Sequence, residues 1–159
     1  MVSLKRHQPS FLNIYGQLLP NAGIVIKHDK DISAYAVQEI CESVGWNKRD
    51  PELVAKALEN SMIVISIWEN EYLVGFVRAT GDKIFNATVW DMVVRPTHQR
   101  RGLGKLLMKE VLKQLDQYRI PLATLYADPG TESFYERFGF LSDPNGARGM
   151  FREKSFQAW

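Results

Sequence analysis

The sequence predicts a mixed α/β domain built around one central sheet. Three β-rich segments, 62–68, 72–80 and 87–94, are separated by short polar turns, which is the pattern of an antiparallel meander. An amphipathic helix over 102–118 joins the third segment to a fourth at 122–127, and such a crossover implies that these two strands run parallel. With 159 residues, the chain has the length of a single domain.

Four segments precede the meander. Residues 1–22 have weak periodicity and are expected to form an irregular leader, so the domain is placed at 23–159. A β-branched run predicts a first strand at 24–27. Two helices are predicted at 34–44 and 51–59, and the second begins with an Asp-Pro pair that places an N-cap before a proline at the first helical position.

The helix at 102–118 has the clearest apolar stripe in the chain, and Pro121 prevents its continuation. A shorter helix is predicted at 132–138. A last strand is predicted to begin at Phe140, to break at 143–146 and to resume near Met150. The stripe of the long helix consists of Leu103, Leu106, Leu107, Val111, Leu115 and Tyr118.

Composition excludes several classes of protein. The net charge is only +2 and the basic residues are scattered, which argues against nucleic acid as the main partner. No apolar run approaches the roughly 18 residues that span a bilayer, and no signal-peptide core is present. We therefore expect no membrane partner and a cytoplasmic location, or the plastid stroma if a transit peptide has been removed. With one cysteine, Cys41, and three widely spaced histidines, no metal site is expected.

The segment most informative about function runs from the third meander strand into the long helix. It places Gly102 and Gly104 where a helix exposes unpaired N–H groups and a partial positive charge, which favours a bound anion. Arg100, Arg101 and Lys105 add positive charge at this end, although cations normally suit the other end of a helix. The sequence predicts an anion site here, with glycines that merely begin a helix as the alternative.

Two other phosphate-binding motifs do not fit this segment. Lys105 is followed by Leu106, so the Ser or Thr that binds magnesium in a Walker-type loop is missing. A Rossmann fingerprint needs three glycines in its first turn, an acidic residue after the next strand and a longer alternating βα pattern.

The segment instead resembles the motif Gln/Arg-x-x-Gly-x-Gly/Ala of the GNAT superfamily of N-acetyltransferases, preceded by the family's Val-x-Pro strand end at 94–96. A second family motif is matched in the expected order at 134–140, and the resemblance covers roughly residues 24–152. It implies the GNAT acyl-CoA N-acyltransferase fold: a mixed sheet of six to seven strands, about four helices, and splayed fourth and fifth strands. It also implies acetyl-CoA as cosubstrate and a primary amine as acceptor. The loop motif is Gln99-Arg100-Arg101-Gly102-Leu103-Gly104.

The resemblance also assigns roles to residues around the cosubstrate. The backbone of 92–94 would pair with the pantetheine arm, the loop at 100–105 would hold the pyrophosphate, and the N–H of Val94 would face the developing oxyanion. Tyr135 matches the tyrosine that protonates the departing thiolate in this family. A phenol suits this role because it stays protonated at pH 7. The predicted cosubstrate contacts are Met92, Val93, Val94, Gln99, Arg100, Arg101, Gly102, Leu103, Gly104, Lys105, Asp128, Ser133 and Tyr135.

The general base is left open between two carboxylates. Some relatives use a glutamate on the fifth strand, but the matching stretch 121–125 has none. Asp91 and Asp128 are the nearest carboxylates and could take the proton directly or through water. Asp91 could instead orient its neighbours, and Asp128 stands where many relatives have an asparagine that contacts the cofactor.

Finer similarities concern the acceptor. Segments 89–94, 134–140 and 149–151 resemble the serotonin and arylalkylamine N-acetyltransferases of plastids and cyanobacteria, which implies an amine such as serotonin or tryptamine and a place in melatonin biosynthesis. Trp46, Phe76 and Trp90 could form an aromatic acceptor pocket, or belong to the core. The alternatives are a protein lysine or N-terminal acetyltransferase and a non-catalytic acyl-CoA-binding module. A homodimer through exposed sheet edges is compatible with the sequence.

Overall fold

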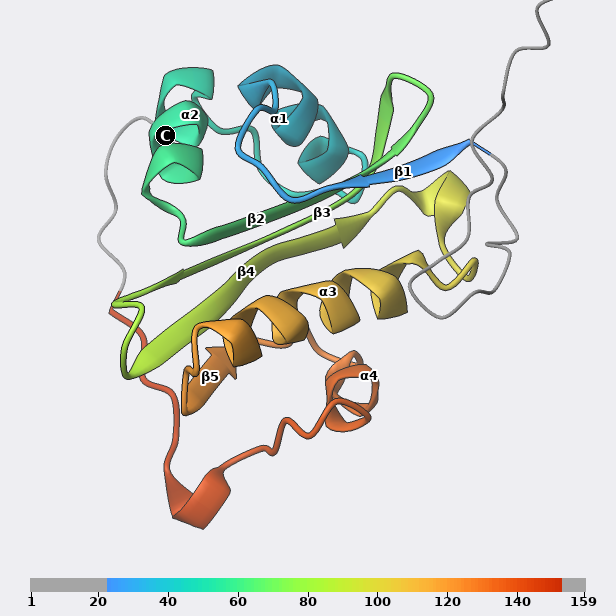
Figure 1. Cartoon of the computed structure of the whole chain (residues 1–159). Helices are drawn as coiled ribbons and strands as arrows, with labels where there is room; N and C mark the ends of the chain where they lie inside the picture. The colour runs from blue at the N-terminus through green and yellow to red at the C-terminus, as the bar shows by residue number, and fades with distance from the viewer. Residues whose placement is uncertain (1–22, 153–159) are drawn as a thin grey trace, which may run out of the picture.

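The computed structural model describes residues 23–152, which form a five-stranded sheet flanked by helices (Figure 1). Neighbouring strands in the sheet are also neighbours in the sequence; β1 to β4 are antiparallel, and β4 and β5 are parallel. The predicted meander and the parallel crossover are therefore confirmed. The strands are β1 (Ile24–Lys27), β2 (Ile63–Glu69), β3 (Tyr72–Gly81), β4 (Asn86–Val94) and β5 (Leu122–Leu125).

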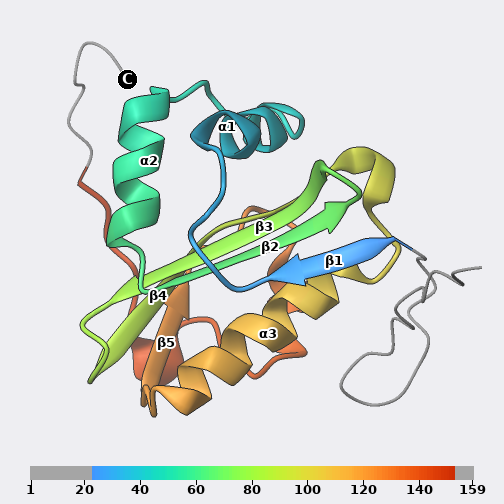
Figure 2. The same cartoon turned by 45° about the horizontal axis from the view of Figure 1, so that its top comes forward.

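The helices cover both faces of the sheet (Figures 1 and 2). On one face lie α1 (Ala34–Glu42) and α2 (Pro51–Asn60); on the other lie α3 (Leu103–Gln117) and α4 (Glu132–Glu136). The cap predicted for the second helix forms, because the Asp50 side chain accepts a hydrogen bond of 2.8 Å from the Glu52 N–H.

Each face of the sheet has its own apolar core. Ile65, Leu107 and Val111 belong to the core between the sheet and α3, whereas Ile40 and Phe76 belong to the core beneath α1 and α2. All five side chains are 0% exposed. Because both faces of β2 and β3 are covered, these central strands are near-continuous apolar runs rather than alternating ones.

The fourth and fifth strands are splayed, as the family resemblance implies. Their parallel pairing begins at Asn86 opposite Leu122 and ends at Val89 opposite Leu125. Beyond that point β4 continues to Val94 with a strand partner on the β3 side only.

The strand predicted to begin at Phe140 does not form, and the sheet of the described residues has five strands where six to seven were predicted. A 3₁₀ turn occupies Pro144–Gly146, preceded by bends at Ser142 and Asp143. Asp143 and Asn145 have positive φ angles of 46° and 57°, and the proline between them has no N–H to donate. A backbone shaped in this way cannot pair with the sheet edge. The leader predicted at 1–22 lies outside the described residues, so the boundary at 23 stays a prediction.

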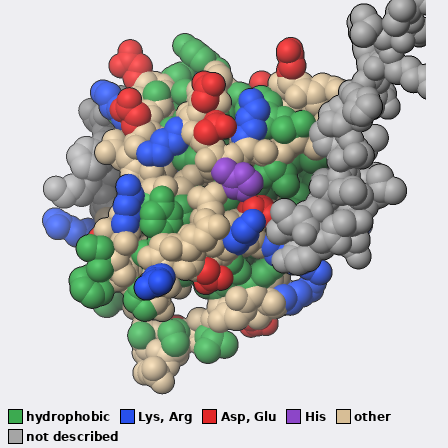
Figure 3. All heavy atoms as spheres, in the orientation of Figure 1, with side chains coloured by type: hydrophobic (Ala, Val, Ile, Leu, Met, Phe, Trp, Pro, Cys, Tyr) green, Lys and Arg blue, Asp and Glu red, His purple; other side chains and the backbone are tan. Residues whose placement is uncertain are grey.

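The surface is mixed in charge where it can be seen in Figure 3. Acidic and basic side chains are interspersed over the coloured part of that face, without a continuous patch of one sign. Within residues 23–152, no helix has the length and apolar character needed to cross a membrane.

Candidate functional site

Strand β4 contains a β-bulge at Asp91. Phe76 of β3 lies opposite Val93, and Arg78 lies opposite Trp90, so two residues of β4 face a single residue of β3 between these pairs. Asp91 itself has a φ angle of 51°, which is strained for a residue with a side chain, although aspartate tolerates it better than most. Bulges of this kind often occur beside active sites, where they redirect a strand.

The extra residue exchanges the two faces of the strand. Before the bulge, Ala87 and Val89 are buried in the core beneath α3. Strict alternation would put Val93 on that face too, but it is buried in the core beneath α1 and α2. Met92 and Val94 pack toward the α3 side instead. The bulge therefore decides which side chains of β4 point toward each layer of helices.

The main chain of β4 after the bulge presents an open edge, which we define as residues 90–94 on the side away from β3. The Arg95 N–H donates a hydrogen bond of 3.0 Å to the Val74 carbonyl of β3. Main-chain groups alternate between the two sides of a strand, so the N–H of Val94 points away from β3, toward the gap left by β5. The Gln99 side-chain amide donates to the Val94 carbonyl at 3.0 Å.

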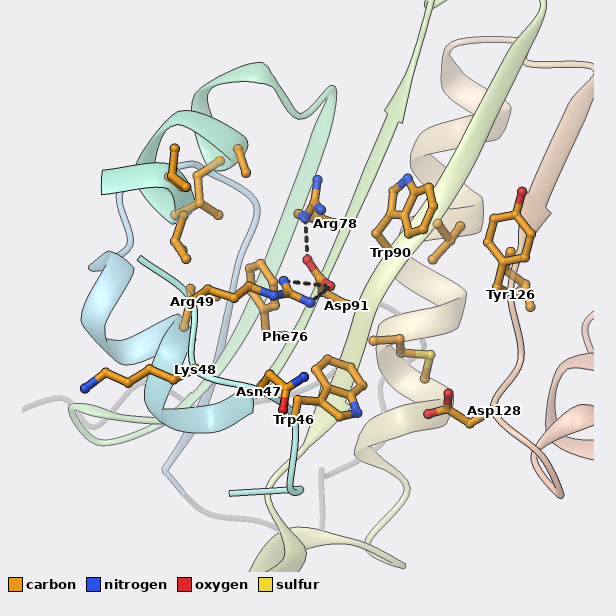
Figure 4. Close-up of a pocket in the computed structure, with 18 of the residues that line it drawn as sticks. Trp46, Asn47, Lys48, Arg49, Phe76, Arg78, Trp90, Asp91, Tyr126 and Asp128 are labelled. Carbon is orange, nitrogen blue, oxygen red and sulfur yellow. Dashed lines mark hydrogen bonds and ion pairs between the residues drawn. The ribbon is translucent and has the colours of Figure 1, made fainter. Parts of the chain in front are cut away.

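A cavity of about 1090 Å³ lies beside the open edge (Figure 4). Its walls come from α1, the α1–α2 loop, α2, β3, β4, the end of β5, α4 and the segment between β5 and α4. This volume is at the upper end of what small-molecule sites enclose, so it has room for the reacting ends of two molecules. The predicted site residues that line it are Trp46, Phe76, Trp90, Asp91, Met92, Asp128 and Tyr135.

The other predicted site residues lie outside the cavity lining, at the end of β4, at or near the beginning of α3, and in α4. Gly104 links the two regions. A Cβ atom built on Gly104 would lie 3.5 Å from the Met92 Cε and 3.7 Å from the Phe134 Cζ. The glycine therefore keeps the first turn of α3 close to the open edge. The residues outside the lining are Val93, Val94, Gln99, Arg100, Arg101, Gly102, Leu103, Gly104, Lys105 and Ser133.

The beginning of α3 has the geometry of an anion site. Gly102 is the N-cap with a φ angle of 83°, and a Cβ built on it would meet nothing within 4 Å. In the described part of the chain, the N–H groups of Leu103, Gly104 and Lys105 find no hydrogen-bond acceptor. The first N–H that does is Leu106, which donates to the Gly102 carbonyl at 3.0 Å. Three convergent N–H groups of this kind fit the charge and size of a diphosphate.

Local ion pairs surround that site. The Arg101 guanidinium donates to the Glu69 carboxylate at 3.1 Å, and His98 lies 3.0 Å from the other Glu69 oxygen. These hydrogen bonds, the one to His98 first, hold the pKa of Glu69 below its ordinary value. His98 is buried and also contacts the Thr97 hydroxyl at 2.8 Å, so it is a satisfied histidine with no free role at the site.

Tyr135 and Asp128 both line the β5–α4 side of the cavity. Burial raises the pKa of Tyr135, and the negative charge of Asp128 raises it further, so the phenol keeps its proton well beyond neutral pH. The Asp128 carbonyl accepts hydrogen bonds from the Thr131 N–H (3.0 Å) and hydroxyl (2.7 Å), which fix the turn into α4. No hydrogen bond or ion pair within residues 23–152 occupies the Asp128 carboxylate.

Two arginines at the site were not predicted from the sequence. Arg78 Nε donates to one oxygen of Asp91 at 2.5 Å, and both terminal nitrogens of Arg49 lie 3.1 Å from the other. The Asp91 side chain is only 9% exposed. Arg78 is the one charged residue in the apolar run 73–79, and that exception could have indicated it. Arg49 lies in a polar loop where nothing in the sequence distinguishes it.

Tyr126 is a third residue that the sequence did not indicate. Its ring centroid lies 5.5 Å from that of Trp90 and 4.8 Å from that of Phe151. Trp90 and Tyr126 line the cavity while remaining 37% and 49% exposed. Over the described residues, no three histidine, cysteine, aspartate or glutamate side chains converge as metal ligands would.

Comparison with known proteins agrees with this geometry. The acetyltransferase (GNAT) family matches residues 31–140. The chain is 46% identical over 132 residues to the uncharacterized N-acetyltransferase ycf52 of Pyropia yezoensis, a match that covers 80% of this chain and 76% of that protein. It is 40% identical over 139 residues to histone acetyltransferase TAP1 of Glycine max, covering 80% of this chain and 60% of that protein.

A solved structure also resembles the fold closely. A GNAT family acetyltransferase from Streptococcus pneumoniae superposes with a TM-score of 0.72 at 26% sequence identity, covering 84% of this chain and 99% of that one. The family match takes in more than half of the chain, including the open edge of β4 and the beginning of α3. The chain therefore belongs to the GNAT family and is an N-acetyltransferase.

Proposed function

We propose that the chain transfers the acetyl group of acetyl-CoA to the primary amine of an arylalkylamine such as serotonin or tryptamine. Acetyl transfer follows from membership of the family, whose acetyltransferases use acetyl-CoA. The proposed site is supported by one observation above all: Tyr135, Asp128 and a group of partly exposed aromatic rings line the same cavity beside the open edge of β4.

The cosubstrate would lie along that edge. Bound there, acetyl-CoA supplies an activated acetyl thioester. The N–H groups of Leu103, Gly104 and Lys105 would bind its diphosphate, because they have no acceptor within the described chain. The main chain of β4 from Met92 to Val94 would hydrogen-bond the pantetheine arm as an added strand would. The Val94 N–H would then donate to the acyl oxygen, where negative charge develops.

Two proton movements are assigned to the cavity. A primary alkylammonium has a pKa near 10 and must lose a proton before its nitrogen can attack. We propose that Asp128 accepts this proton, because its carboxylate has no hydrogen-bond or ion-pair partner within the described residues. Asp91 would instead orient its neighbours, because its two oxygens already accept hydrogen bonds from arginines. Tyr135 would give its proton to the departing sulfur, which agrees with its raised pKa.

The aromatic lining supports the arylalkylamine. Large aromatic side chains are usually well buried, yet Trp90 and Tyr126 leave 37% and 49% of their surface exposed beside the cavity. Trp46 of the α1–α2 loop lines the same cavity (Figure 4). A flat ring stacked between such side chains would bury apolar surface on both of its faces.

The second candidate function is acetylation of protein amines. The name of the Glycine max relative, a histone acetyltransferase, favours it. A panel of amines tests both: tryptamine and serotonin against lysine-containing and free-N-terminus peptides, with the release of coenzyme A thiol measured. Faster turnover of the arylalkylamines would support the proposal, and faster turnover of peptides would reverse it. Thiol release that depends on an amine would exclude the non-catalytic acyl-CoA-binding module.

Location and assembly stay predictions. The proposed partners are small amines, with proteins in the second candidate function, and neither nucleic acid nor membrane is proposed. The compartment is predicted to be the cytoplasm or the plastid stroma. A homodimer is compatible with the position of β1 at one edge of the sheet that the described residues form.

A further inference from the structure

We propose that Arg49, Asp91 and Arg78 form a latch that fastens the α1–α2 loop to the β4 bulge and thereby sets how tightly the acceptor amine is bound. We call these three side chains the latch, and residues 45–50 the acceptor loop. The inference rests on the proposed function, because it concerns the acceptor side of the same cavity.

The latch joins three separate elements (Figure 4). Arg49 belongs to the acceptor loop, Asp91 to β4 and Arg78 to β3. Each arginine takes a different oxygen of the carboxylate, at 2.5 Å for Arg78 and 3.1 Å for Arg49. Charge-assisted bonds to both oxygens fix the direction of the carboxylate as well as its position. The Arg78 side chain is 16% exposed and that of Arg49 is 45% exposed, so Arg49 is the side that can open.

The acceptor loop depends on this contact. At its first end, the Trp46 N–H donates to the Cys41 carbonyl of α1 at 3.2 Å, and at its last end Asp50 caps α2. Between these ends, the ion pair of Arg49 with Asp91 joins the loop to β4. All six residues of the loop line the cavity, so any movement of the loop changes the space for the acceptor.

Asp91 is thus a positioning residue rather than the base. A proton from the substrate would have to compete with two guanidinium groups for its oxygens. The backbone of Asp91 has the positive φ angle of the bulge, and the bulge turns the Val94 N–H toward the gap beside β5. The latch holds the Asp91 side chain in place. One carboxylate consequently fixes both the acceptor loop and the strand that faces the thioester.

The first experiment compares steady-state kinetics of Arg49→Ala and Arg49→Lys with those of the wild type. Arg49→Ala should raise the KM for tryptamine roughly three- to fivefold, while kcat and the KM for acetyl-CoA change by less than about twofold. Arg49→Lys keeps the charge and should recover part of the loss. Lys56→Ala is the matched control, since it removes an exposed cation from α2 outside the cavity lining.

The Asp91 variants separate a latch from a base. Asparagine tolerates the left-handed backbone as aspartate does, so Asp91→Asn removes the charge without adding backbone strain. A latch predicts a raised KM for the amine and an unchanged acidic limb of kcat/KM against pH. It also predicts that adding Arg49→Ala to Asp91→Asn changes the KM little further. Loss of the acidic limb in Asp91→Asn would make Asp91 the base and overturn the proposal.

A measurement without turnover completes the test. Cys41 is the single cysteine, it is buried next to the acceptor loop, and burial, with the Asp91 charge second, raises its pKa to about 11. Opening the loop should expose this thiol, so an aromatic disulfide reagent should label Arg49→Ala several times faster than Lys56→Ala or the wild type. Equal labelling together with an unchanged KM would overturn the latch. If no amine is acetylated, the proposed function fails, while the labelling rates still decide whether the latch holds the loop.

Discussion

The two halves of β4 are built differently although they belong to one strand. The closed half, residues 86–89, pairs with β3 on one side and β5 on the other, and buries Ala87 and Val89 in the core beneath α3. The open half, residues 90–94, pairs with β3 alone, contains the bulge at Asp91 and exposes part of Trp90 to the cavity. The closed half satisfies its backbone within the fold, whereas the open half keeps backbone groups for a partner.

An unpaired strand edge is usually a liability, because it can pair with another chain. Here the open half lies inside the molecule, between the acceptor loop and the segment from β5 to α4, so the cavity limits what can reach it. We therefore expect substitutions around the open half of β4 to change the rate of acetyl transfer or ligand binding. Substitutions in the closed half should change the free energy of unfolding.

The largest effect is expected from Tyr135→Phe, which removes a phenol that lines the cavity beside the open half. It should lower kcat about 100-fold, because a positioned general acid contributes roughly that much, while coenzyme A affinity measured by calorimetry stays the same. Tyr118→Phe, at the exposed end of α3, is the matched control and should behave as the wild type. An unchanged kcat in Tyr135→Phe would remove the acid role.

The pH dependence sharpens this test. Burial and the Asp128 charge raise the pKa of Tyr135 above its ordinary value of 10.0, so its acidic form persists as pH rises to that value. At saturating tryptamine, kcat should therefore show no decline from loss of this proton between about pH 7 and about pH 9. A fall in kcat centred between these pH values, seen in the wild type but not in Tyr135→Phe, would contradict this. It would show that the phenol loses its proton below its ordinary pKa.

Val89→Ala tests the closed half and should be the next largest effect. The side chain is 4% exposed, and the two lost carbons leave a cavity beneath α3, so the free energy of unfolding in urea should fall by roughly 2 kcal/mol. Coenzyme A affinity should remain that of the wild type. Val25→Ala, at a site on β1 that is 39% exposed, should cost much less. A loss of affinity without a loss of stability would contradict the assignment of the closed half.

Gly104→Val should have a smaller effect, on binding. An alanine Cβ would sit at ordinary contact distance, 3.5 Å, from the Met92 Cε, whereas the added methyl groups of valine must enter the crevice between α3 and the open half. We expect the Kd for coenzyme A to rise about tenfold in Gly104→Val and by less than about threefold in Gly104→Ala. Equal affinities for the two variants would show that the ligand does not pass close to this glycine.

The smallest effect is expected at the join between β4 and β5. The Thr88 and Thr124 hydroxyls lie 2.9 Å apart across the parallel pair and are exposed. Replacing either by valine should lower the free energy of unfolding by about 0.5 to 1 kcal/mol, and the double variant should cost no more than one of them. Additive costs in the double-mutant cycle would mean that the two hydroxyls do not interact.

Elements with local signals could be predicted from the amino-acid sequence alone. Helices predicted at 34–44, 51–59 and 102–118 correspond to α1, α2 and α3, because apolar periodicity and caps act within a few turns of one segment. The meander and the crossover followed from turn lengths in the same way. The predicted anion loop also depends on consecutive residues, which is why its glycines and basic side chains could be named in advance.

Contacts between distant segments could not be predicted in this way, because they depend on how the whole chain packs. Arg49 and Asp91 are 42 residues apart, and the ion pair between them depends on where the acceptor loop lies over β4. The bulge at Asp91 likewise depends on the register between β3 and β4. The absence of the predicted last strand from the described sheet depends on which strand edges come together. Periodicity records which face of a segment is apolar, but the partner opposite that face is fixed only when the whole chain packs.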